Sequence, residues 1–69
     1  MDKKLFKSKM VLFGDTLVKL SAAIGISRSR LCAKINESNG AEFSQSEITK
    51  IKYRYKLTSD EVNAIFFAK

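Results

Sequence analysis

The segment from Ser27 to Asn36 concentrates positive charge. Arg28, Arg30 and Lys34 lie within seven residues that include no acidic side chain. Guanidinium and ammonium groups are common ligands of phosphate, and the guanidinium also matches the hydrogen-bonding edge of guanine. The whole chain carries a net charge of +6 with a pI near 9.7, which suits phosphate backbones or other anionic surfaces. The alternative is a solvated helix face on a protein that is simply basic.

Catalytic and metal-binding chemistry lack the residues that they need. The sequence has no histidine and one cysteine, Cys32, so it offers no credible zinc ligand set and no intramolecular disulfide. Most of its seven carboxylates lie near expected helix starts, and there is no glycine-rich phosphate loop. We therefore expect no enzyme activity, no metal and no cofactor.

Length and apolar content predict one small domain covering residues 1–69. A chain of this length buries only a marginal core, and its 45% hydrophobic residues exclude a fully disordered protein. No apolar run approaches the roughly 20 residues of a transmembrane helix, and no signal-peptide hydrophobic region follows Met1. We expect a cytoplasmic protein with no membrane partner.

The pattern of glycines and capping residues predicts an all-α fold of five short helices without a strand. Proline is absent, and three glycines separate segments with helical apolar spacing. In the first segment the apolar stripe consists of Leu5, Phe6, Met10 and Phe13, flanked by Val11 or Leu12. The expected helices cover about residues 2–13, from Asp15 or Thr16 to Gly25, from Ser27 to about Asn36, from Ser44 to about Lys56, and about 59–68. A polar loop over residues 37–43 precedes the fourth helix.

The second and third helices have the arrangement of a helix-turn-helix. Gly25 allows the chain to reverse between them, and Ser21 is small where the two helices approach each other. The side chains expected on the inside of the pair are Leu20, Ile24, Ile26, Leu31 and Ile35. A simple helical hairpin would need these apolar residues but would not need the cations of the second helix.

The stretch TLVKLSAAIGISRSRLCAKIN, residues 16–36, resembles the helix-turn-helix of phage repressor and Cro-like proteins of the xenobiotic-response-element type. FSQSEITKI and LTSDEVNAIFF resemble the fourth and fifth helices of short phage-encoded members, so the resemblance covers nearly the whole chain. It implies a lambda-repressor-like domain that regulates transcription in a bacterial host. Such proteins bind double-stranded operator DNA, usually as homodimers on palindromic sites.

The resemblance also assigns roles to individual residues. Residues 27–36 would form the recognition helix in the major groove, with its N-terminal part against the base edges. The implied base contacts are Arg28, Ser29 and Ala33. The implied phosphate contacts are Arg30 and Lys34, and Asn36 is a further candidate at the end of the same helix. The lysines of the fourth helix are expected to be a solvated face, with Lys50 or Lys52 at most a secondary phosphate contact.

Three apolar residues suggest a protein interface. Family members commonly carry Gln at the first residue of the second helix, where it reaches a phosphate, but this chain has Leu17. In the last helix, Ile65 and Phe67 are candidates for a dimer contact, although Phe67 would also fit a crevice of the core. Leu17 and Phe67 support an alternative function, an antirepressor-type modulator that binds the partner repressor of a phage switch instead of DNA.

Cys32, Tyr53 and Tyr55 are expected to pack and not to react. Nothing in the sequence marks Cys32 as a reactive thiol. Without a strand to display them as a stacking platform, the two tyrosines are expected in the core or at its boundary.

Overall fold

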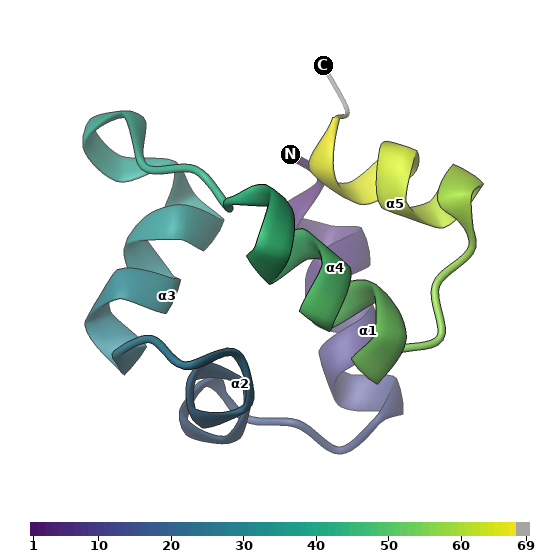
Figure 1. Cartoon of the computed structure of the whole chain (residues 1–69), viewed down its shortest axis with the longest axis horizontal. Coiled ribbons are helices and arrows are strands. Elements are labelled where there is room, and N and C mark those ends of the chain that lie inside the picture. The colour runs from purple at the N-terminus through teal and green to yellow at the C-terminus, as the bar shows by residue number, and fades with distance from the viewer. Residues whose placement is uncertain (68–69) are drawn as a thin grey trace.

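The computed structural model describes residues 1–67, in which the chain forms five α-helices and no strand (Figure 1). The elements are α1 (Lys3–Leu12), α2 (Leu17–Ile24), α3 (Arg28–Asn36), the 3₁₀ turn η1 (Ser38–Gly40), α4 (Gln45–Arg54) and α5 (Ser59–Phe66). The all-α prediction is confirmed. The expected end of the last helix, near residue 68, lies outside the described residues.

Each α-helix begins after a polar side chain that accepts a hydrogen bond from a backbone amide three residues later. These N-caps are Asp2, Thr16, Ser27, Ser44 and Thr58. In α4 and α5 a glutamate returns the bond to the capping residue, so both expected capping boxes are confirmed. Thr16, and not Asp15, caps α2.

The helices α1 to α4 each end near a left-handed residue, namely Gly14, Gly25, Glu37 and Lys56. Gly25 has φ 79°, and the next amide, of Ile26, donates to the carbonyl of Ser21 at 3.0 Å. Lys56 has φ 52°, and the Leu57 amide donates to Lys52 in the same pattern. The chain therefore leaves α4 after Arg54, about two residues earlier than the capping pattern predicts.

The core receives one completely buried side chain from every α-helix. These residues are Phe6, Leu20, Leu31, Ile51 and Ile65. The Phe66 ring meets Phe6 edge-on with centroids 6.0 Å apart, which joins α5 to α1. Because Ile65 faces the core, the expectation that it contributes to a dimer contact is wrong: a side chain with no exposed surface cannot reach a second molecule.

Polar contacts join the ends of the helices. Asp15 accepts two hydrogen bonds of 2.7 Å from the Arg54 guanidinium and one of 2.7 Å from the Tyr55 hydroxyl. The hydrogen bonds from Arg54 lower the pKa of Asp15, and burial opposes them only in part. This clamp fixes the α1–α2 connection to the C-terminal end of α4.

Contacts at both ends join α1 to α5. The Asp2 amide donates to the Ile65 carbonyl at 2.7 Å, and Lys9 pairs with Glu61 at 2.5 Å. Figure 1 accordingly shows the N-terminus beside α5. Within residues 1–67 no helix is both long enough and apolar enough to cross a membrane.

Candidate nucleic-acid interface

The α3 helix is anchored by its inner face. Leu31 and Ile35 lie four residues apart and are both buried, and they join Leu20 and Ile24 of α2 in one apolar cluster. The α2–α3 pair packs more extensively than any other pair of elements. The orientation of α3 is therefore set mainly by α2.

The turn between these helices determines where α3 starts. A Cβ added to Gly25 would meet no atom within 4 Å, so glycine is required there for the positive φ and not for space. Ser21 is buried, and its hydroxyl donates to the Val18 carbonyl at 2.9 Å. Ser27 then caps the new helix by accepting from the Arg30 amide at 3.2 Å. These local bonds fix the start of α3 without using the side chains of Arg28, Ser29 or Arg30.

The first turn of α3 carries the exposed polar groups. Arg28, Ser29 and Arg30 are exposed, and in the described part of the chain neither guanidinium belongs to an ion pair. Ser29 and Ala33 lie one turn apart and point away from the core, and Ala33 is half-buried. The outer face of α3 is thus small at its centre and cationic at its N-terminal end, a shape that allows close approach to an anionic groove.

Lys34 does not belong to this exposed group. Its ammonium pairs with the Glu47 carboxylate at 2.6 Å, and the two side chains are only 12% and 10% exposed. The expected phosphate contact by Lys34 is therefore wrong in this fold, because the charge is already neutralised inside the molecule. The pair links α3 to the first turn of α4.

Glu47 serves two helices at once. Besides Lys34, its Oε1 accepts a hydrogen bond of 2.8 Å from the Ser44 amide, which completes the capping box of α4. Burial raises the pKa of Glu47, but the hydrogen bonds from Lys34 and Ser44 outweigh this effect and lower the pKa below its usual value. Glu47 is therefore ionised at neutral pH and holds the C-terminal half of α3 against α4.

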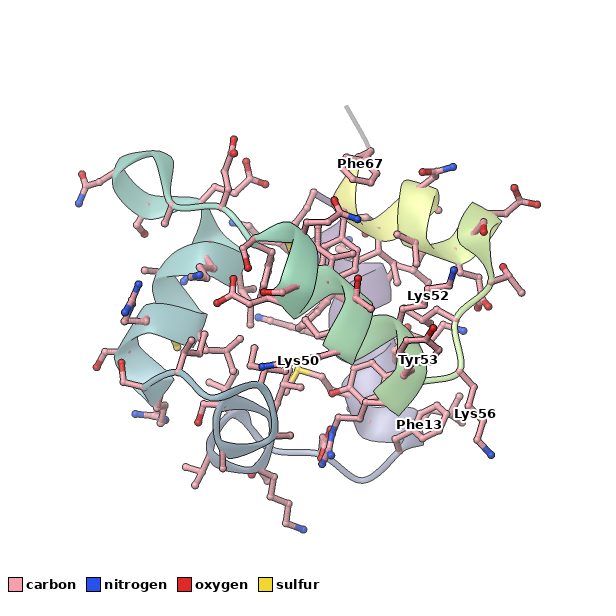
Figure 2. The ribbon with its side chains drawn as sticks, in the orientation of Figure 1. Phe13, Lys50, Lys52, Tyr53, Lys56 and Phe67 are labelled. Atoms are coloured by element: carbon pink, nitrogen blue, oxygen red, sulfur yellow. The ribbon has the colours of Figure 1, made fainter. Side chains whose placement is uncertain are left out.

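Two other expected phosphate contacts lie apart from the arginines. Asn36 is exposed, but it ends α3 roughly 12 Å along the axis from Arg28. Lys50 is exposed on α4, and its ammonium lies 3.5 Å from the Ile24 carbonyl at the end of α2 (Figure 2). Lys50 therefore adds positive charge beside the turn that leads into α3, whereas Asn36 does not.

The two remaining interface candidates differ in exposure. Leu17 is half-buried and packs against the core, so it offers little free apolar surface. Phe67 is more than half exposed and lines a pocket of about 230 Å³ together with Phe43 and Phe66.

Among the described residues no three histidine, cysteine, aspartate or glutamate side chains converge to hold a metal ion.

Sequence reasoning missed several exposed apolar side chains near the C-terminal ends of α1 and α4. Val11, Leu12 and Tyr53 are among the most exposed large apolar side chains. The expectation of a core or boundary position is therefore confirmed for Tyr55, which is buried, but is wrong for Tyr53. The signal was available for α1, because three consecutive apolar residues at a helix end cannot all face one core. For Tyr53 the spacing from Tyr55 shows that the two rings cannot share a face, but not which ring is buried.

Comparisons of the chain with models of known protein families, with curated proteins and with solved structures find no match.

Proposed function

We propose that this protein is a Cro- or repressor-like regulator that binds operator DNA with α3 in the major groove. The observation that carries the proposal is that Arg28 and Arg30 are exposed and form no ion pair within residues 1–67, on the first turn of a helix whose opposite face is buried. The net charge of +6 supports association with a polyanion. Arg28 and Ser29 would contact base edges beside Ala33, and Arg30 and Lys50 would contact phosphates.

The proposal extends to two copies on one site. A symmetric pair of recognition helices matches successive major grooves when they are about 34 Å apart. Phe67 remains as a dimer contact, since Ile65 is buried. Such a regulator would work in the cytoplasm of a bacterial host.

The test begins with selection of binding sequences from randomised duplexes, followed by fluorescence anisotropy at several salt concentrations. Arg30→Ala is expected to reduce the slope of log affinity against log salt by about 0.9, the share of one phosphate contact. Arg28→Ala is expected to lose about 1–3 kcal/mol of discrimination at one base pair. Lys4→Ala removes the same charge from α1 and serves as the matched control. Equal slopes for Arg30→Ala and Lys4→Ala would defeat the proposed contact.

A second candidate function is a modulator that binds a partner repressor protein in place of DNA. Its support is the exposed Phe67, while Leu17 adds less because it packs against the core. Gel shifts with DNA alone, and then with the cognate repressor, distinguish the two functions. Binding to the repressor without any binding to DNA would favour the modulator.

A further inference from the structure

Tyr53 has the most exposed large apolar side chain among the residues that the structure describes, with 77% of its surface accessible. A single exposed apolar residue is ordinary, so the surroundings of the ring decide whether it has a role. Tyr53 and Lys50 lie three residues apart on α4 and therefore share a face of that helix. Both line a shallow groove of about 530 Å³ between α4 and the C-terminal end of α2, which we call the α2–α4 groove.

The α2–α4 groove has an apolar side and an aromatic side. From α2 it receives Ala23, which is exposed, and Ile24, which is buried. Because Ala23 carries only a methyl group, this side of the groove leaves room for a flat group beside the Tyr53 ring. Ligand sites commonly have volumes of about 300–1,000 Å³, so the groove is large enough for a nucleotide.

The free charges at the α2–α4 groove are positive. Lys50 is exposed, and its ammonium lies 3.5 Å from the Ile24 carbonyl (Figure 2). Lys19 is also exposed and lies one turn before Ala23 on α2. Within residues 1–67 neither lysine forms an ion pair.

The neighbouring carboxylates do not cancel these two charges. Asp15 already accepts two hydrogen bonds of 2.7 Å from the guanidinium of Arg54, the remaining residue of the groove. Glu47, three residues before Lys50 on α4, is paired with Lys34. An anionic ligand in the groove would therefore meet two ammonium groups and an aromatic ring.

We propose that the α2–α4 groove binds single-stranded nucleic acid, with one base stacked on Tyr53 and adjacent phosphates held by Lys50 and Lys19. Proteins that bind single strands combine a positively charged groove with aromatic rings on which bases stack. A duplex cannot use the ring in this way, because its bases are already stacked on one another. An acidic peptide would satisfy the lysines but would leave the ring without a flat partner.

This site goes beyond the proposed function of α3. The residues that line the groove come from α2 and α4, and none of those described belongs to α3. Lys50 is also the proposed contact for a duplex phosphate, so Tyr53 is the residue that distinguishes the two sites. Tyr53→Ala is expected to leave duplex affinity unchanged, and a failure of duplex binding would leave the single-strand site standing.

The test compares a fluorescent single strand of thymidines with an abasic strand of the same length by anisotropy. We expect the thymidine strand to bind about tenfold more tightly, equivalent to about 1.4 kcal/mol. Tyr53→Ala is expected to remove this preference, and Tyr53→Phe to keep it because the ring face remains. Phe67→Ala removes an exposed ring at the end of α5 and serves as the matched control (Figure 2).

The charges have a separate readout. Lys50→Ala is expected to reduce the slope of log affinity against log salt by about 0.7 for the thymidine strand. In an NMR titration of the ¹⁵N-labelled protein, the same strand should shift residues 23–25 and 50–54. The proposal is overturned by equal affinity for the two strands, or by equal losses in Tyr53→Ala and Phe67→Ala. Shifts confined to residues 28–30, or equally tight binding of an oligoglutamate peptide of the same charge, would also overturn it.

Discussion

The ion pair between Lys34 and Glu47 is the feature whose removal tests the structure most directly. Replacing Lys34 by Met keeps the volume and the helix propensity but leaves a nearly buried carboxylate without its cation. Breaking a fully buried pair costs about 3–5 kcal/mol, and an exposed pair is worth about 0–1 kcal/mol. Glu47 keeps its hydrogen bond from the Ser44 amide, so we expect a loss of about 2 kcal/mol. A chain of 69 residues has only about 3–10 kcal/mol of stability, so this loss is large but leaves the protein folded.

Urea unfolding followed by circular dichroism measures this loss. A double-mutant cycle with Glu47→Gln isolates the coupling, which we expect to be about 1–2 kcal/mol. Lys4→Met makes the same substitution at an exposed site on α1 and is expected to change the free energy of unfolding by less than about 0.5 kcal/mol.

If the protein binds DNA as proposed, DNA binding supplies a second readout. Lys34→Met is expected to leave the salt dependence of DNA affinity unchanged, because the ammonium already faces Glu47. Unchanged stability together with a slope reduced by about 0.9 would refute this reasoning and make Lys34 a phosphate contact after all.

A change of pH and substitutions at Ile65 and Phe67 give two further predictions. Asp15 and Glu47 both have pKa values below their usual 3.8 and 4.5, so each stabilises the fold above its unfolded pKa and loses that effect as the pH falls through the folded pKa. Urea unfolding should therefore show falling stability below about pH 4.5, with a smaller fall in Asp15→Asn; a pH-independent stability would contradict the clamp. Ile65→Ala should lower the free energy of unfolding by about 2–5 kcal/mol, and Phe67→Ala by less than about 1 kcal/mol. A larger loss of stability for Phe67→Ala than for Ile65→Ala would contradict the burial of Ile65 and the exposure of Phe67.

The helices could be predicted because their determinants are local. The capping residue Ser44 bonds to Glu47 only three residues away. Gly25 indicates a helix end because glycine adopts the left-handed conformation without steric strain. Apolar spacing likewise identified Leu31 and Ile35 as the inner face of α3. These signals lie within one or two turns of the chain.

The contacts between helices could not be predicted in the same way. Lys34 and Glu47 are 13 positions apart, and Asp15 and Arg54 are 39 apart. In the sequence, Lys34 and Arg54 look like any exposed cation on a helix. Each forms an internal ion pair only because the fold brings a carboxylate next to it. The exposure of Tyr53 could not be predicted for the same reason. The spacing of apolar residues along a helix does not show which side chains another element covers.

The backbone hydrogen bond between Asp2 and Ile65 has a consequence for folding during synthesis. The backbone hydrogen bond and the contact between Phe6 and Phe66 join residues about sixty positions apart. The ribosome therefore synthesises α1 long before α5, which packs against it. The α2–α3 unit, in contrast, can assemble from neighbouring sequence. Until α5 is synthesised, the apolar face of α1 is open to chaperones, proteases and other nascent chains. The supply of folded protein in a cell is therefore sensitive to how soon α5 follows.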